Sequence, residues 1–422
     1  MKIAAIILFI AMYVIMVAKP NYRKWAALGT AAIFVAAGIL PAKNIFGEID
    51  WNVIMMIAGT MVIVDYFIAS KMPNLIADIL LDKAKNVMWV TIYMSLFAGA
   101  ISAFIDNVAT VLMVAPVGIA VCRKLKINPT GMIISIAVSS NLQGAATLVG
   151  DTTSIMLGAY AHMDFTKFFW MNGKPGIFWA VELGAVATVP VLMFLFRDQK
   201  RPVHAEEKTK VTDLVPSVML ILVVALLIAA SFIPDKPDIT NGLICCILAG
   251  ISMLYDFIHT KSRHNFVRAV RGIDYNTILL LIGLFVVIGG IKEVGVIDDV
   301  AAAISKVGGN NMFLLYTVIV FGSVIISAFI DNIPYVATML PVVQSVSSML
   351  GVEPYLLYFG LLSGATLGGN LTPFGASANI AAIGILEKNG TKVGMKDFFR
   401  IGVPLTMAAV LAGYAFIWIV WH

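Results

Sequence analysis

The six residues Ser-Ala-Phe-Ile-Asp-Asn occur twice in this chain, at residues 102–107 and again at residues 327–332. A segment rich in glycine and hydroxyl residues follows each copy, and the step from the first copy to the second equals the step from Gly150 to Gly375. A repeated hexapeptide at a matched distance from a matched segment indicates an internal duplication. The sequence therefore predicts a protein built from two similar halves.

Each copy places an aspartate, Asp106 or Asp331, inside an apolar run. An aspartate at the centre of a lipid bilayer costs about 2.5 to 3.5 kcal/mol on insertion scales, so two at matched positions favour a functional role. We interpret the surrounding segments, residues 87–122 and 312–350, as two re-entrant hairpins with the aspartates at their tips. A purely local alternative is that each carboxylate caps a helix N-terminus at the turn.

The composition is that of a polytopic membrane protein, because 60% of the residues are hydrophobic and only 13% are charged. A soluble domain has a smaller apolar share and about 25% charged residues. Apolar runs recur along the whole chain and leave no stretch for a separate soluble domain, so we expect the function to lie within the lipid bilayer. The net charge of +5 comes from basic loops and indicates no nucleic-acid partner.

No enzyme chemistry is predicted. The three cysteines form no CxxC pair and the five histidines fall in loops or at the end of the chain, so we expect neither a metal cluster nor a nucleophile–base pair. The chain has no Walker loop, which indicates an ion gradient as the energy source in place of ATP. We expect no cofactor beyond a coupling ion, H+ or Na+.

Ten candidate spans approach the length of about 20 apolar residues that a bilayer requires. Eight are uninterrupted: residues 3–17, 25–40, 51–69, 177–196, 213–232, 239–257, 275–291 and 403–421. Two, residues 130–160 and 354–386, contain glycine-rich breaks and are predicted to be discontinuous helices. The predicted fold is an all-α polytopic membrane protein with two inverted-topology repeats, about ten transmembrane helices, two re-entrant hairpins and two discontinuous helices.

Loop charge orients these spans. With both hairpins re-entrant, each half has five crossings, the halves are inverted relative to each other, and most of the 29 Lys and Arg residues, Arg23 among them, lie on the cytoplasmic side. The repeats are then residues 1–200 and 213–422, joined by a cytoplasmic linker, residues 201–212. Both termini are predicted to be outside, in the inner membrane of a bacterial cell. If each hairpin were instead a pair of helices that cross the membrane, most loops would lie on the same side of the membrane as before. Loop charge therefore does not decide whether the hairpins are re-entrant.

The interrupted stretches supply the candidate binding residues. Lipid offers backbone groups no hydrogen-bond partners, so an unwound segment has to face protein or a water-filled cavity. Glycine permits the break, and freed carbonyl groups with Thr, Ser, Asn and Asp oxygens can coordinate a small cation. Hydrogen bonds to neighbouring helices are the alternative role for these hydroxyl groups. The candidates are Thr147, Gly150, Asp151, Thr152, Thr153 and Ser154 in the first stretch and Asn370, Thr372, Gly375, Ser377 and Asn379 in the second.

Each hairpin tip is predicted to face the interrupted stretch of its own half. The first half has an extra carboxylate, because Ala376 occupies the position equivalent to Asp151. The first site is therefore the one we expect to couple transport to a proton or cation, and no lysine or arginine is expected in either site. The two possible sodium sites are Asp106, Asn107 and Asp151 in the first half and Asp331, Asn332 and Asn379 in the second.

The motifs SAFIDNVATVLMVAPV, GAATLVGD, SAFIDNIPYVATMLPVV and GATLGGNLTPFGASANI resemble those of the ion transporter superfamily. The resemblance is to its permeases of the melanosomal P protein, arsenite permease and sodium/proton antiporter type, which share a citrate transporter-like domain. It covers both halves, from about residue 50 to the end. It implies two hairpins, two broken helices, an elevator-like transport cycle and a homodimer. Sodium/dicarboxylate symporters of this superfamily carry Ser-Asn-Thr at the hairpin tips, where this chain has Asp106-Asn107-Val108 and Asp331-Asn332-Ile333.

We therefore predict an ion-coupled secondary active transporter of a small inorganic ion or oxyanion. Arsenite or antimonite exchanged for protons and sodium exchanged for protons are the two expected reactions. Two alternatives remain open: a sodium-coupled di- or tricarboxylate symporter, and an anion channel of the chloride-conducting kind. Carboxylates at both tips favour coupled transport over a channel.

Overall fold

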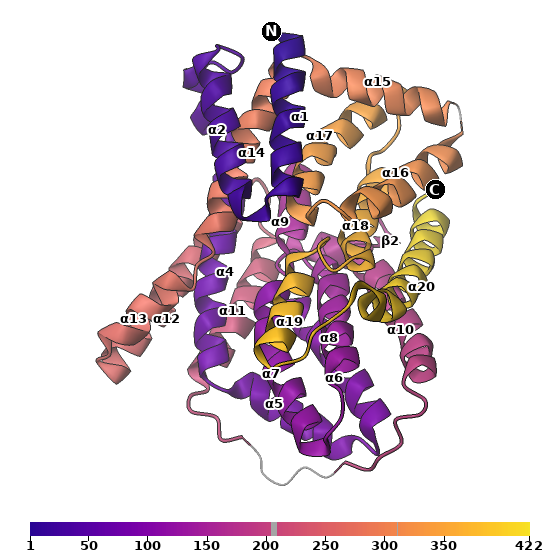
Figure 1. Cartoon of the computed structure of the whole chain (residues 1–422). Coiled ribbons are helices and arrows are strands. Elements are labelled where there is room, and N and C mark those ends of the chain that lie inside the picture. The colour runs from indigo at the N-terminus through magenta and orange to yellow at the C-terminus, as the bar shows by residue number, and fades with distance from the viewer. Residues whose placement is uncertain (204–208, 310) are drawn as a thin grey trace.

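A computed structural model describes residues 1–203, 209–309 and 311–422, and these residues are almost entirely helical (Figure 1). Among them, seven helices are long and apolar enough to cross a membrane, which confirms the predicted all-helical membrane protein. A two-stranded hairpin of β1 (Trp170–Met171) and β2 (Lys174–Pro175) is the small exception. The seven are Trp51–Ala69 (α4), Asn107–Leu125 (α7), Ile177–Leu195 (α10), Thr240–Thr260 (α12), Arg263–Glu293 (α13 with α14), Asn332–Leu350 (α17) and Met395–Trp421 (α20).

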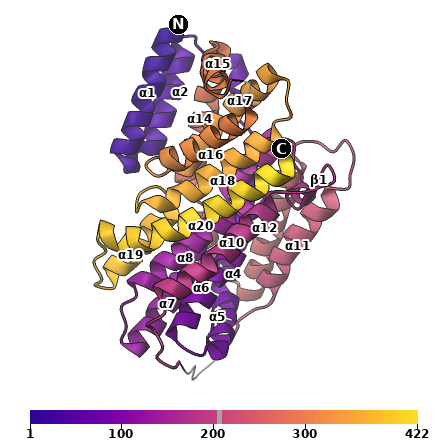
Figure 2. The ribbon, with the colours of Figure 1, turned by 90° about the vertical axis from the view of Figure 1, so that its right-hand side faces the viewer.

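Shorter helices connect and flank these spans. Four of them are also apolar: α1 (Lys2–Ala18), α6 (Val87–Ser102), α11 (Val215–Ala230) and α16 (Met312–Ser327). The others are α2 (Arg23–Ala36), α3 (Ile45–Glu48), α5 (Met72–Lys83), α8 (Thr130–Gln143), α9 (Thr152–Tyr160), α15 (Val296–Gly308), α18 (Tyr355–Gly368) and α19 (Ser377–Lys388). The span of residues 263–293 consists of α13 (Arg263–Arg271) and α14 (Tyr275–Glu293). Figures 1 and 2 place the α1–α2 pair and α15 at one end of the molecule and α5 at the other.

Two helical hairpins, α6–α7 and α16–α17, carry the repeated hexapeptide at their turns. The Asp106 carboxylate accepts hydrogen bonds from the backbone amides of Val108 and Ala109, and Asp331 accepts one from the amide of Ile333. Both aspartates therefore cap the second helix of their hairpin. Capping uses only part of each carboxylate, so it leaves oxygen lone pairs for other partners.

Two helices are interrupted at the glycine-rich stretches. In the first half α8 passes through a short 3-10 turn (Gly144–Ala146) and an extended residue, Thr147, before α9 begins. In the second half α18 passes through the turn Gly369–Leu371 and the extended Thr372 before α19 begins. The same backbone break in both halves follows from the matched sequence of the two stretches.

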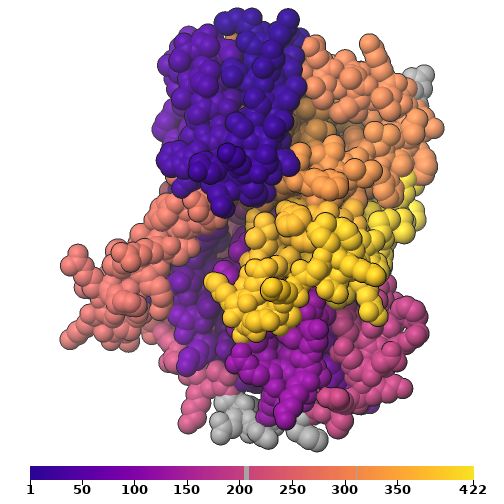
Figure 3. Space-filling model, in the orientation of Figure 1, coloured from indigo at the N-terminus to yellow at the C-terminus, as the bar shows by residue number. Residues whose placement is uncertain are grey.

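The predictions missed two amphipathic helices, α5 and α15, which connect α4 to the first hairpin and α14 to the second. Both are only 12 or 13 residues long and carry charged side chains, such as Asp78 and Lys83 on α5 and Asp298 and Asp299 on α15. A search for apolar runs long enough to span a bilayer passes over such segments. The helix α13 was missed for the same reason, and its corner with α12 projects from the rest of the surface (Figures 1 and 3).

The two halves interlock through crossed helix pairs, with α12 of the second half packed on α4 of the first and α14 packed on α2. Matched glycines make both crossings possible. A Cβ atom built on Gly59 would lie 2.5 Å from the carbonyl carbon of Cys245, and one on Gly283 would lie 2.7 Å from that of Ala27. Only glycine allows backbones to approach this closely. The crossed pairs therefore form one scaffold shared by both halves.

Candidate functional site

The first hairpin tip is joined directly to the first interrupted helix. A Cβ atom on Gly150 would lie 2.7 Å from the carbonyl oxygens of both Ser102 and Ala103, so this glycine lets the broken stretch touch the tip. The hydroxyl of Thr147 donates a hydrogen bond to the carbonyl of Ala103. The candidate residue Thr147 thus braces the tip, while Gly150 provides the space for the contact.

The second half repeats this junction. A Cβ atom on Gly375 would lie 2.8 Å from the carbonyl oxygens of Ser327 and Ala328. The hydroxyl of Thr372 donates to the carbonyl of Ala328. The equivalence of the two junctions shows that a glycine and a threonine at this spacing attach a tip to its broken helix.

We expect Gly150→Ala and Gly375→Ala to prevent assembly of the site, because the added methyl groups would also approach the carbonyls of Gly144 and Gly369 within 2.5 and 2.6 Å. Overpacking of this kind destabilises by about 1 to 3 kcal/mol or more, and here the contacts are backbone atoms that cannot rotate away. The yield of monodisperse protein after detergent extraction measures the effect. Gly322→Ala on α16 is the matched control, since its methyl group would meet nothing within 4 Å. Equal yields for all three variants would contradict the assigned role of the two glycines.

Asn141, near the end of α8, joins the two tips at the centre of the molecule. Its side-chain oxygen accepts hydrogen bonds from the amide of Asn107 at 2.8 Å and from that of Asn332 at 3.4 Å. Its own amide donates to the carbonyl of Thr366 and to the side-chain oxygen of Asn370. Asn141 is fully buried and was not among the predicted site residues. It holds the two halves of the site in register.

A small cavity of about 40 Å³ lies between the two tips. A water molecule needs roughly 10 to 15 Å³ by this measure, so the cavity is large enough for an ion with one or two waters. Four aspartates reach it, from both tips, one broken helix and the scaffold. The lining residues are Met61, Asp106, Asn107, Val108, Asp151, Thr152, Asp274, Thr277, Asp331, Asn332, Ile333 and Ser377.

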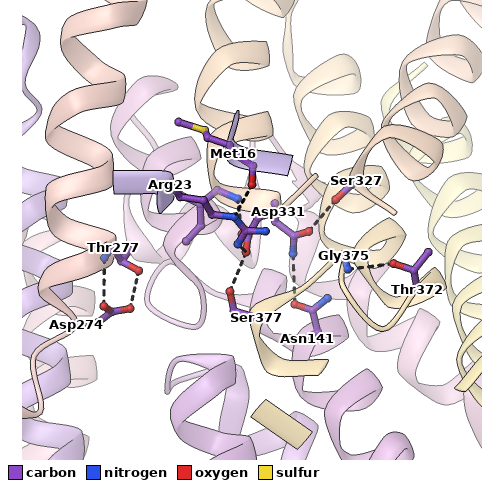
Figure 4. Close-up of polar contacts among 12 residues, drawn as sticks. Met16, Arg23, Asn141, Asp274, Thr277, Ser327, Asp331, Thr372, Gly375 and Ser377 are labelled. Carbon is purple, nitrogen blue, oxygen red and sulfur yellow. Dashed lines mark hydrogen bonds and ion pairs between the residues drawn. The ribbon is translucent and has the colours of Figure 1, made fainter. Parts of the chain in front are cut away.

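The carboxylate of Asp331 is neutralised by an arginine from the scaffold (Figure 4). Nη1 of Arg23 lies 2.7 Å from Oδ2 of Asp331, and Ser377 donates its hydroxyl to the same oxygen at 2.8 Å. The side chains of Asp331 and Arg23 are 7% and 16% exposed, so the ion pair is largely buried. The expectation of a site without lysine or arginine was therefore wrong, because the start of α2 brings Arg23 to the second tip.

The carboxylates of the first half have no such partner. Asp106 accepts hydrogen bonds from the Val108 and Ala109 amides, and Asp151 accepts one from the hydroxyl of Thr153 at 3.1 Å. In the described ranges no lysine or arginine forms an ion pair with Asp106 or Asp151. The two tips therefore differ in charge: Asp331 is paired, whereas Asp106 and the neighbouring Asp151 are not.

Asp274 and Thr277 bring the start of α14 to the same cavity. The Asp274 carboxylate caps α14 by accepting from the amides of Asn276 and Thr277 and from the Thr277 hydroxyl, at 2.6 Å for the last (Figure 4). The capping role is observed, and the same side chain also adds a fourth acid to the cavity.

Several predicted residues support the site without lining the cavity. Asn379 donates its amide to the carbonyls of Gly369 and Thr372 and so stabilises the second break. Ser154 donates to the carbonyl of Gly144 at 3.4 Å. Asn370 donates to the carbonyl of Val138. In the described part of the chain no three His, Cys, Asp or Glu side chains are close enough to hold a metal ion together, so a cation here would need amide, hydroxyl or carbonyl ligands as well.

Comparison with known proteins gives consistent relatives. The family model CitMHS, described as a citrate transporter, matches residues 11–263 and 239–421. An uncharacterized transporter of Mycobacterium tuberculosis is 31% identical over 434 residues, covering 99% of each chain. The human P protein is 23% identical over 96% of this chain and 58% of its own length.

Two solved structures share the fold at low sequence identity. The YdaH transporter of Alcanivorax borkumensis superposes with a TM-score of 0.63 at 12% identity, covering 94% of this chain and 96% of that one. MtrF of Neisseria gonorrhoeae, described as one of a class of antimetabolite efflux pumps, gives a TM-score of 0.60 at 14% identity, covering 92% and 84%. These matches extend over nearly the whole chain, so both halves belong to one transporter fold.

Proposed function

The chain belongs to the citrate transporter (CitMHS) family of the ion transporter superfamily, and from that premise we propose a proton- or sodium-coupled secondary active transporter of a small inorganic ion or oxyanion. The single observation that carries the proposal is the unequal charge of the site. Asp331 is paired with Arg23, whereas Asp106 and Asp151 share the cavity and pair with no lysine or arginine among the residues that the structure describes. Buried carboxylates without a partner are strongly unfavourable, so they take up a proton or a cation.

The coupling ion binds at Asp106 and Asp151. The oxygens of Asn107 and Thr152, which line the same cavity, complete its coordination. A sodium ion accepts such a mixed set of carboxylate, amide and hydroxyl oxygens, and a proton needs only one carboxylate. The pair Asp331 and Asn332 forms the pseudo-symmetric site, with the guanidinium of Arg23 in place of a free cation.

Movement of one unit against the scaffold carries the site across the membrane. The moving unit comprises the two hairpins and two broken helices (α6–α9 and α16–α19) with α10 and α20, which pack on them. The scaffold comprises α1, α2, α4, α11, α12 and α14. In this arrangement both hairpins are re-entrant, ten helices cross the inner membrane in two inverted halves, both termini are outside, and two chains form a homodimer.

The substrate class follows from the size and charge of the cavity. A volume of about 40 Å³ holds a small inorganic species, and four acids repel a bare anion. Exchange of arsenite or antimonite for protons and exchange of sodium for protons are the reactions to test first. A channel is the less suitable alternative, because an ion-paired and enclosed site binds ions too firmly for rapid conduction.

A second candidate, cation-coupled transport of citrate, is favoured by two observations. The family model is described as a citrate transporter, and the guanidinium of Arg23, which pairs with the Asp331 carboxylate here, is the group that a substrate carboxylate would bind in place of Asp331. Citrate would have to enter with cations that offset its charge, because Asp106, Asp151 and Asp274 also line the cavity.

Purified protein in proteoliposomes tests the proposal. We expect uptake or efflux of one substrate class to follow an imposed pH or sodium gradient and to stop when the gradient is collapsed by an ionophore. The panel contains arsenite, antimonite, sodium and citrate, each with and without the gradient. Electrical recording on the same protein separates a transporter from a channel, since unitary currents of thousands of ions per opening would overturn the proposal. Transport of no substrate under any gradient would do the same.

A further inference from the structure

The two halves of the scaffold make the same contacts, which aligns their residues one by one. Asn52 accepts a hydrogen bond from the backbone amide of Gly242 at 2.7 Å, and Asn276, at the equivalent position of α14, accepts one from Nζ of Lys24 at 2.8 Å. The step from Lys24 to Gly242 equals the step from Ala27 to Cys245, the two residues that meet the matched glycines Gly283 and Gly59. Two independent contacts thus give one alignment of α2 with α12.

In this alignment Asn241 is equivalent to Arg23, and Asp50 is equivalent to Asp274. The equivalent residues nevertheless have different surroundings. Arg23 contacts the second tip and Asp274 lines the central cavity. Asp50 instead faces a separate cavity of about 420 Å³, and Asn241 faces one of about 720 Å³.

The cavity of about 420 Å³ lies farther along the same moving helices than the central cavity does. The central cavity is lined by Met61, Asp274 and Thr277 of the scaffold, and their equivalents Phe285, Asp50 and Val53 all line the cavity of about 420 Å³. On α9 the central cavity meets Thr152, whereas the other meets Met156 and Tyr160. At 1.5 Å per residue, four to eight residues correspond to a shift of roughly 6 to 12 Å.

We propose that Asn241 and Asp50 complete the site in the opposite transport state, where they take the places that Arg23 and Asp274 hold here. A slide of the moving unit by about one to two helical turns releases Asp331 from Arg23 and brings Asp106 to the amide of Asn241. Asp50 then lines the cavity between the tips. This inference rests on the proposed alternating movement, and it names the scaffold residues that position the site after that movement.

The scaffold partner of the tip is charged in one state, where it is Arg23, and neutral in the other, where it is Asn241. Arg23 neutralises Asp331 in the present state, whereas the neutral amide of Asn241 can only donate a hydrogen bond to Asp106. Asp106 therefore depends on its bound cation in both states. Asn241 positions the tip without competing with that cation, as a second arginine would.

Cross-linking in the full-length chain tests the inference. Cys122, Cys245 and Cys246 are replaced by alanine, a protease site is inserted after Pro202, and cysteine pairs are treated in membranes with a short bifunctional thiol reagent. A cross-link between the halves keeps them together on a denaturing gel after cleavage. The pair Arg23→Cys with Asp331→Cys reports the present state and shows that the variant chain is folded.

We expect the pair Asn241→Cys with Asp106→Cys to cross-link as well. A second pair, Val53→Cys with Ser377→Cys, retains every acid of the site and should also react, because the equivalent residues Thr277 and Thr152 share the central cavity here. Asn265→Cys with Asp106→Cys, which joins the tip to the projecting α13, is the negative control. Reaction of the Arg23 pair without reaction of either test pair would overturn the inference.

The outcome is independent of the transport assay. Transport by the wild-type protein without either predicted cross-link would reject the roles of Asn241 and Asp50 while leaving the proposed function intact. Cross-links in a protein that transports no substrate of the panel would support the movement and reject the proposed function.

Discussion

Replacing Asp106 by asparagine is expected to reduce gradient-driven transport by roughly 10- to 100-fold while the protein remains folded. The asparagine oxygen can still accept the hydrogen bonds from the amides of Val108 and Ala109, because asparagine is as good an N-cap as aspartate. The charge that attracts the coupling ion is lost. An interaction with a charged group contributes about 1.5 to 3 kcal/mol, so the affinity for the cation should fall by roughly 10- to 100-fold.

Three measurements separate loss of coupling from loss of the protein. Gradient-driven flux in proteoliposomes should fall with the cation affinity, substrate binding to the purified variant should persist, and the thermal unfolding midpoint should change little. Asp198→Asn, an exposed residue after α10, is the matched control and should transport normally. Normal transport by both Asp106→Asn and Asp331→Asn would refute the site.

The features that follow from local sequence were predictable. The second hairpin, Met312–Leu350, has the bounds expected from its sequence, and α4 spans Trp51–Ala69 as its apolar run indicated. Both predictions rest on residues within one element or on the repeated hexapeptide, and a repeated sequence encodes the same local turn twice. The breaks in α8–α9 and α18–α19 were equally readable, because glycine and polar residues cluster inside otherwise apolar spans.

The residues that complete the cavity were not predictable in this way. Arg23 stands near a helix end beside Lys24 and has the sequence signature of a cytoplasmic loop charge. Its contact with Asp331 joins positions 308 residues apart and depends on how α2 crosses the second half. Asn141 lies within α8 and bonds both tips, and its own sequence segment does not indicate these partners. The roles of Arg23 and Asn141 both depend on how the two halves pack against each other. Aligning the sequence of one half with that of the other does not reveal this packing.

Arg23→Gln is expected to destabilise the folded protein strongly. The substitution leaves the carboxylate of Asp331 buried, and its remaining partners in the described part of the chain are the Ser377 hydroxyl and the backbone amide of Ile333. Removing one member of a buried ion pair typically destabilises by about 3 to 5 kcal/mol. Chemical denaturation in detergent measures the loss. Lys24→Gln is the matched control on the same helix, since the Lys24 contact with Asn276 is exposed and should contribute under about 1 kcal/mol.

The double variant Arg23→Gln with Asp331→Asn shows which part of this loss comes from the uncompensated charge. An asparagine at position 331 can retain the cap and the hydrogen bond with Ser377, so most of the lost stability should return, and the two substitutions should be strongly non-additive. In the single variant the vacated position becomes a second cation site. Sodium or acid should then restore stability to Arg23→Gln, and the dependence of transport on cation concentration should steepen. A simple sum of the two single effects, with no response to cations, would mean that Arg23 serves only to pack α2 against the tip and does not replace a coupling ion.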